Sequence, residues 1–126
     1  MFTVNEYKIL FNHRWHLRTS DYGNGRYDTV CEIYTQCTTT LTKRIIYREK
    51  PSFTGVAKLH PNDQVDKLVG KKVALLNAMI TGYRVDRVSG QKKPDYHLEF
   101  YIKSKRTAIW KAFWQWVASW PNQTAS

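Results

Sequence analysis

The stretch that decides the fold is residues 61–82, PNDQVDKLVGKKVALLNAMITG, because the hydrophobic period changes there. Its apolar side chains recur every three or four positions, which is the spacing of one wide face of an amphipathic helix. Asn62 or Asp63 can cap the start of this helix, and Gly82 supplies a stop at its end. The sequence therefore predicts a helix from Asp63 to Ile80.

The side of this helix opposite the apolar stripe is basic and low in relief. Such a strip can lie along a phosphate backbone, or it can simply keep the helix hydrated. Both interpretations stay open on the sequence alone. The strip consists of Lys67, Lys71, Lys72, Ala74 and Ala78.

The sequence before residue 61 predicts strands, since it is rich in β-branched and aromatic residues. Residues 21–25, DYGNG, favour a hairpin, because Gly, Asn and Asp tolerate tight turns. The alternation of apolar and polar residues is interrupted around Glu6. Residues 13–18 either extend the first strand or pair beside it. Residues 37–42 either continue the second strand or form a polar loop. The expected strands are Phe2 to Phe11, Tyr27 to Thr35, Lys43 to Glu49 and Phe53 to Leu59.

Two segments follow the central helix. Residues 84–94 are polar and basic and contain Gly90 and Pro94, so we expect an exposed connection there. The apolar residues between positions 98 and 102 alternate with other residues, which suits either a strand or the start of a helix. The sequence leaves this choice open.

A second helix is expected from Lys105 onward, with Ser104 as its cap and Pro121 at its end. Trp110 and Trp114 lie on the flank of its apolar face, so the helix carries more rings than one core-facing stripe can use. The apolar face itself consists of Ile109, Phe113, Trp116, Val117 and Trp120.

These elements predict an α+β fold: an antiparallel sheet of about four strands packed against one central helix, plus an aromatic-rich C-terminal helix. A length of 126 residues fits one hydrophobic core. We expect a single domain over residues 1–121 and a flexible tail over residues 122–126.

The composition favours an anionic partner. Lys and Arg number 20 against 10 Asp and Glu, which gives a formal net charge of +10. No apolar run is long enough for a membrane span, the first residues lack the pattern of a signal peptide, and the only cysteines are Cys31 and Cys37. We therefore expect reduced thiols, no membrane association and a cytoplasmic location.

The flanking aromatic rings admit two interpretations. In the simpler one they pack under the basic loop or form a dimer interface, so a homo-oligomer stays possible. In the other, Trp110 or Trp114 stacks on a base while neighbouring cations contact phosphates. The cations nearest in sequence are Lys103, Lys105, Arg106 and Lys111, with Lys92 and Lys93 upstream.

A second basic cluster lies at residues 13–18, HRWHLR. In a strand, Arg14 and Arg18 share one face and Trp15 lies on the other, which gives a cationic ridge behind an anchoring ring. The ridge either contacts phosphate or is an ordinary solvated face.

The sequence predicts no metal site, no cofactor and no catalysis. His13, His16, Cys31 and Cys37 do not have the spacing of a zinc site, and a strand places the two histidines on opposite faces. No nucleophile elbow, metalloprotease motif, phosphate loop or dinucleotide fingerprint is present.

Four motifs together resemble a pattern found in small bacteriophage-encoded accessory proteins. They are Thr29-Val30-Cys31 in a strand, Gly55-Val56-Ala57 in another strand, Asp63 and Asp66 at the start of a helix, and Arg106 to Trp110 in a late helix. The resemblance implies a phage protein that acts in the host cytoplasm among factors that blunt bacterial immunity, such as anti-CRISPR proteins. It implies no catalytic residue.

The leading hypothesis is a non-catalytic protein that binds nucleic acid or a nucleic-acid-containing host complex. Two alternatives are an inhibitor that binds a host defence enzyme directly and an oligomeric sponge for a nucleotide signal. The candidate binding residues are Arg14, Trp15, Arg18, Lys67, Lys71, Lys92, Lys93, Lys105, Arg106, Trp110, Lys111 and Trp114.

Overall fold

The computed structural model describes residues 1–16, 26–59 and 67–120, and it confirms the α+β class. A five-stranded antiparallel sheet is followed by two helices, with a two-stranded hairpin between them. The elements in chain order are β1 (Phe2–Val4), β2 (Tyr7–His16), β3 (Arg26–Thr38), β4 (Ile45–Tyr47), β5 (Phe53–Leu59), α1 (Lys67–Met79), β6 (Ile80–Val85), β7 (Lys92–Tyr96), the 3-10 helix η1 (Leu98–Phe100) and α2 (Lys103–Ala118).

The long strand β3 organises the main sheet. One edge of β3 pairs with β2, and the other edge pairs first with β5 and further along with β4. The antiparallel pairing of β2 with β3 confirms the expected hairpin, although residues 21–25 lie outside the described part of the chain. The expected strand from Phe2 to Phe11 is in fact two strands, because Asn5 adopts a left-handed φ of 51° and turns the chain back on itself.

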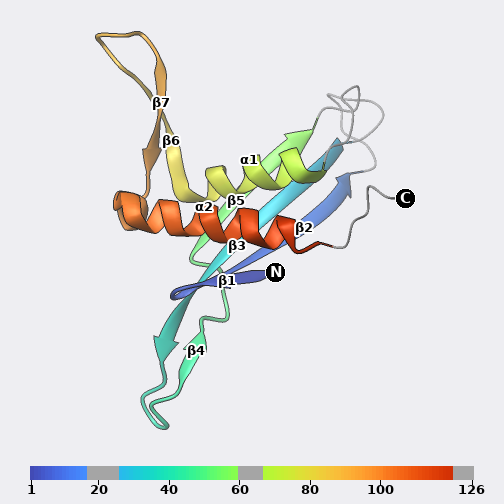
Figure 1. The fold of residues 1–126 in the computed structure, drawn as a ribbon, viewed down its shortest axis with the longest axis vertical. Helices are drawn as coiled ribbons and strands as arrows, with labels where there is room; N and C mark the ends of the chain where they lie inside the picture. The colour runs from blue at the N-terminus through green and yellow to red at the C-terminus, as the bar shows by residue number, and fades with distance from the viewer. Residues whose placement is uncertain (17–25, 60–66, 121–126) are drawn as a thin grey trace.

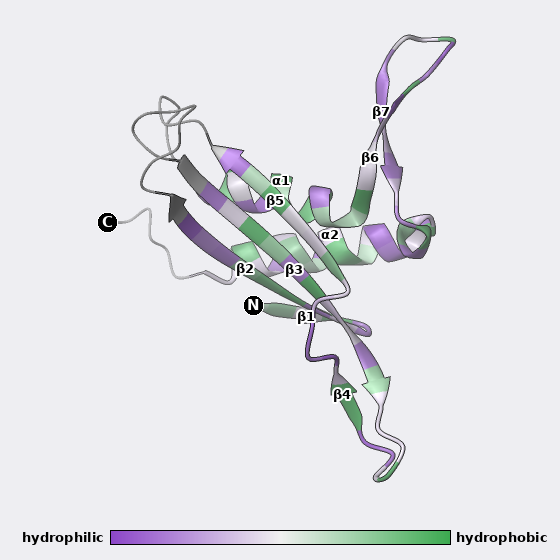
Figure 2. Ribbon diagram, turned by 180° about the vertical axis from the view of Figure 1, so that it is seen from behind, coloured by the Kyte–Doolittle hydropathy of each residue, from purple (hydrophilic) through white to green (hydrophobic). Residues whose placement is uncertain are grey.

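Both helices cover the same face of the sheet, and no other described helix or strand lies over the opposite face (Figures 1 and 2). The core lies between these layers. Phe113 of α2 contacts the ring of Phe2 in β1, which anchors α2 over the end of the sheet that α1 leaves uncovered. The fully buried side chains include Ile9, Ile33, Leu75, Met79, Phe100, Ile109 and Phe113.

Helix α1 lies on β5 at backbone distance. A Cβ atom added to Gly55 would lie 2.1 Å from the Ala78 nitrogen and 2.3 Å from the Ala74 oxygen. Ala74 and Ala78 are fully buried, so their placement in a solvent-facing strip was wrong. The small residues of α1 face the sheet because only they permit this close approach, and Val69 and Val73 are exposed instead.

The chain passes from α1 into β6 without a loop. The helix ends at Met79, and Gly82, which was expected to stop the helix, lies inside β6. The β-branched Ile80 and Thr81 favour the extended state, and the Met79 carbonyl accepts a hydrogen bond from the His97 N–H of the returning chain.

Residues 84–94 are exposed, as expected, but most of them belong to a β-hairpin. Strand β6 pairs with β7 from Ile80↔Tyr96 to Val85↔Lys92, and the hairpin extends away from the rest of the fold (Figure 1). Gly90 closes the turn with a φ of 71°, and its N–H donates to the Asp86 carbonyl.

The open choice at residues 98–102 is settled in favour of a helical turn, since Leu98–Phe100 form η1. Helix α2 then begins at Lys103 with Ile102 as its N-cap, so the prediction that Ser104 caps the helix was wrong. It ends at Ala118, where the Ser119 hydroxyl donates to the Trp116 carbonyl, before Pro121, which lies outside the described residues. Neither described helix has the length and apolarity needed to cross a bilayer.

Candidate functional site

The helical layer is basic throughout. Helix α1 carries three lysines, α2 carries three lysines and one arginine, and neither helix contains Asp or Glu. Because the charged side chains of both helices are all positive, the surface potential is positive wherever a cation has no carboxylate partner. The cations are Lys67, Lys71, Lys72, Lys103, Lys105, Arg106 and Lys111.

Lys105 is paired with acids inside the fold. Its ammonium lies 2.7 Å from a Glu99 carboxylate oxygen and 3.4 Å from one of Glu6. The Tyr7 hydroxyl donates to the same Glu99 oxygen. The hydrogen bonds from Lys105 and Tyr7 hold the pKa of Glu99 below its usual range, and the bond to Glu99 raises the pKa of Lys105. Lys105 therefore fastens the start of α2 to the β1–β2 turn.

Arg106 also has partners within the chain. Its guanidinium donates to the carbonyls of Phe100, at 2.7 Å, and Tyr101, at 3.0 Å, and lies 4.2 Å from the centroid of the Tyr96 ring. These contacts hold η1 against the first turns of α2. We therefore build the candidate site from the remaining cations of the two helices.

Two of these cations lie over tryptophan rings where α1 faces α2. The Lys72 ammonium lies 5.3 Å from the centroid of Trp114, and the Lys71 ammonium lies at the same distance from that of Trp120. Trp114 is 44% exposed, whereas Trp110 packs edge-on against Phe113 at the margin of the core. Of the two flanking rings that the sequence singled out, Trp114 is therefore the accessible one.

We call this surface the lysine–tryptophan face. Lys111 belongs to it because it lies three residues before Trp114, on the same side of α2. Lys67 belongs to it because it lies four residues before Lys71 on α1. The face consists of Lys67, Lys71, Lys72, Lys111, Trp114 and Trp120.

One end of the face is held by a polar chain that the sequence did not indicate. The Lys71 ammonium donates to Nε2 of His13 at 3.0 Å, and Nδ1 of the same ring lies 3.0 Å from the Thr29 hydroxyl. Burial, then Lys71 and Lys67, lower the pKa of His13, and burial, then Lys67, lower that of Lys71. The positive charges at this end therefore lie close enough to repel one another. A bound anion would relieve this repulsion, so this end of the face favours an anionic ligand.

Acidification is expected to destabilise the protein through His13. The folded-state pKa of this residue is below its ordinary value of 6.5, so the unfolded chain binds the proton first and stability falls as the pH drops below that value. Replacement of His13 by Gln, which keeps hydrogen-bonding groups but does not titrate, should flatten this dependence. Urea unfolding between pH of about 7.5 and about 5.5 would measure it, and equal slopes for both proteins would contradict the prediction.

The other candidate residues lie apart from this face. Arg14 follows His13 in β2 and therefore points to the uncovered side of the sheet, in register with Asp28 of β3. Trp15 ends up in β2, where only its backbone is described, and Arg18 lies outside the described residues. Lys92 and Lys93 are on β7, where Lys93 forms an ion pair with Asp86 at 2.9 Å.

The cysteines lie apart from these basic residues. Cys31 is fully buried in β3, where burial raises its thiol pKa, and Cys37 is half-buried further along the same strand. Within the described ranges, no three His, Cys, Asp or Glu side chains gather closely enough to hold a metal ion.

Comparisons with known proteins return no relative from which to argue. No protein-family model, no curated protein and no solved structure matches the chain. The function must therefore be inferred from the chemistry of the lysine–tryptophan face.

Proposed function

We propose that the protein binds nucleic acid through the lysine–tryptophan face. The observation that carries this proposal is the Lys72 ammonium over the exposed Trp114 ring, between α1 and α2, which contain no acid within their described bounds. A base that stacks on Trp114 replaces the ammonium over the ring, and the displaced ammonium meets the phosphate attached to that base. Cation and ring thus serve one nucleotide together.

The two kinds of contact have different signatures. Stacking of a base on an aromatic side chain contributes about 1–3 kcal/mol and tolerates any sequence. Each phosphate contact releases counterions, so affinity falls with salt, with a slope of about 0.7 per contact for a single strand. Binding to this face should be sensitive to salt and weakly selective for sequence.

Replacement of Trp114 by Ala is expected to weaken binding of a labelled single-stranded oligonucleotide about 5- to 150-fold. Replacement of Lys72 and Lys111 by Gln should lower the salt slope by about 1.4. Fluorescence anisotropy over a salt series, with both DNA and RNA oligonucleotides, measures the two effects. Mass action then gives the change in binding free energy directly.

Matched controls lie elsewhere on the surface. Arg48→Gln with Lys50→Gln removes the same charge from an exposed segment after β4, and Tyr101→Ala removes an exposed ring. Both controls should bind like the parent protein. The proposal is overturned if neither oligonucleotide binds at about 50 mM salt, or if the Trp114 variant binds as tightly as the parent.

A direct inhibitor of a host protein is the second candidate function. Val69 and Val73 are exposed on α1 beside Lys72, so apolar surface adjoins the lysine–tryptophan face. A protein complex centred on Trp114 should survive high salt and nuclease treatment, and Trp114→Ala should weaken it more than any lysine change does.

The remaining expectations stay predictions. They are the origin of the protein among phage accessory factors, its action against bacterial immunity in the host cytoplasm, the lack of catalysis and the alternative of an oligomeric nucleotide sponge. Purification of the protein from infected host extract, with and without nuclease, would identify the bound molecule.

A further inference from the structure

The β6–β7 hairpin projects from the end of the molecule where α1 finishes and α2 begins (Figure 1). We call it the arm, and it comprises residues 80–96. Its outer half carries four cations and one acid. The cations are Arg84, Arg87, Lys92 and Lys93, and the acid is Asp86.

The single acid of the outer half is fully engaged. Asp86 forms an ion pair with Lys93 at 2.9 Å and accepts a hydrogen bond from the Val88 N–H at 2.8 Å. Both contacts hold the pKa of this carboxyl below its usual range. Among the described residues, no carboxylate pairs with Arg84, Arg87 or Lys92, so three positive charges remain for an external anion.

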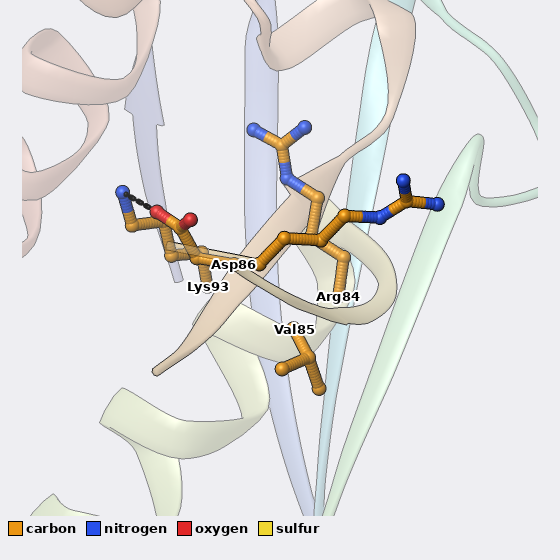
Figure 3. Close-up of a pocket in the computed structure, with 5 residues that line it drawn as sticks. Arg84, Val85, Asp86 and Lys93 are labelled. Atoms are coloured by element: carbon orange, nitrogen blue, oxygen red, sulfur yellow. Dashed lines mark ion pairs between the residues drawn. The ribbon is translucent and has the colours of Figure 1, made fainter. Parts of the chain in front are cut away.

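Two of these cations, Arg84 and Arg87, border a hollow of about 300 Å³ near the turn of the arm. In Figure 3, Asp86 faces Lys93, Arg84 extends away from this pair, and Val85 lies on the opposite side of the ribbon. The hollow is lined by Arg84, Val85, Asp86, Arg87 and Lys93. An anionic group that enters it meets two guanidinium groups, while the acid beside it is already neutralised by Lys93.

The arm also carries exposed apolar side chains. Val85 is 63% exposed and Val88, beside the turn, is 96% exposed. By register, Val85 lies opposite Lys92 and Tyr83 lies opposite Pro94, so one side of the ribbon is apolar and carries a single cation. The other side carries Arg84 opposite Lys93. A partner of this arm must offer both phosphate-like charge and apolar contact.

The shape of the arm identifies that partner. The DNA major groove, about 12 Å wide and 8.5 Å deep, admits a two-stranded β-ribbon and presents thymine methyl groups on its floor, whereas the major groove of duplex RNA is too narrow. From Gly82 to Asp86, where the turn begins, the arm reaches about 13 Å at the usual rise per residue, which exceeds the depth of the groove.

We propose that the arm enters the major groove of double-stranded DNA. Arg84, Arg87 and Lys92 contact the phosphates at the groove edges, and Val85 and Val88 contact base edges and thymine methyl groups. This inference rests on the proposed function in taking nucleic acid as the partner, but it concerns a different surface. Under this inference the two surfaces bind different forms of nucleic acid: the arm binds a duplex, and the lysine–tryptophan face binds unpaired bases.

The test compares a blunt DNA duplex with a single-stranded oligonucleotide of the same length. Replacement of Arg84, Arg87 and Lys92 together by Gln should weaken duplex binding at least about tenfold at 0.1 M salt and lower its salt slope by about 2 to 3. Single-strand binding should change by less than about threefold. The variant keeps Asp86, Lys93 and Gly90, so the contacts that close the arm remain.

The charge-matched control replaces Arg44, Arg48 and Lys50 by Gln, since all three are exposed in and around β4. This control should bind the duplex like the parent. A duplex affinity that is unchanged in the arm variant, or lowered equally in the control, overturns the inference and leaves the Trp114 result unaffected. A last measurement is sedimentation with vesicles of phosphatidylserine. If the protein binds these vesicles through the arm and does not bind the duplex, the partner is a lipid and the inference is also overturned.

Discussion

Replacement of Gly55 by Ala is expected to lower the free energy of unfolding by about 3 kcal/mol or more. The added methyl group would lie 2.1 Å from the Ala78 nitrogen and 2.3 Å from the Ala74 oxygen. These are backbone atoms of the second half of α1, so no side-chain rotation relieves the clash. The helix must move off the sheet, and the packing of Ala74 and Ala78 against β5 is lost with it.

Gly82→Ala is the matched control for this substitution. Gly82 also lies in a strand, but an added Cβ meets no atom within 4 Å. Alanine there should leave stability unchanged or raise it by up to about 1 kcal/mol, because it restricts the unfolded chain. Urea unfolding followed by tryptophan fluorescence compares the two variants. Equal unfolding midpoints for the two variants would show that the backbone of α1 does not pack directly against Gly55.

Phe113→Ala is expected to cost about 3–5 kcal/mol, in the range for a fully buried ring. Phe113 contacts the rings of Phe2 in β1 and Phe11 in β2, which join α2 to the sheet, and the ring of Trp116 in its own helix. Its loss leaves a cavity at the junction of both layers. Helix α1 packs on β3 and β5, so a movement that filled the cavity would cost those contacts.

The next residue provides the contrast. Trp114→Ala should cost only about 1 kcal/mol, since the ring is 44% exposed and its removal loses an edge contact with Phe113 and a contact with the Lys72 ammonium. Comparing the unfolding midpoints of Phe113→Ala and Trp114→Ala distinguishes the buried face of α2 from its exposed face. A similar loss of stability in both variants would mean that Trp114 lies in the core and is not available for stacking.

The elements that the sequence predicted correctly are those whose pattern reports burial on one side. The period of three to four residues identified α1, and the turn residues between β2 and β3 identified their hairpin. The arm has solvent on both sides, so its strands show no alternation. Gly90 and Pro94 then indicate a loop as readily as a hairpin.

The packing of small residues could not be assigned to a face in advance. Ala74 and Ala78 fit a helix surface toward water as well as one against a sheet, and Gly55 decides between them from another element. The candidate site shows the same limit. Helical spacing placed Trp110 and Trp114 on one flank, but only the position of Phe113 and the core shows which ring is covered.

The polar chain from Lys71 to Thr29 runs through His13, which lies 58 positions before Lys71. No local pattern reports such a contact, since each residue alone has an ordinary surface or strand position. Strand alternation placed His13 and Arg14 on opposite faces, but it did not indicate that His13 contacts Lys71 of α1.

The direct passage from α1 to β6 has a mechanical consequence. Ala78 and Met79 are clamped against the core, and the next residue already belongs to the arm, while His97 ties the returning strand to the Met79 carbonyl. The arm is therefore rigidly attached to α1 at its base. A force on the tip of the arm is transmitted to the contact between α1 and β5, so binding at the tip strains that contact.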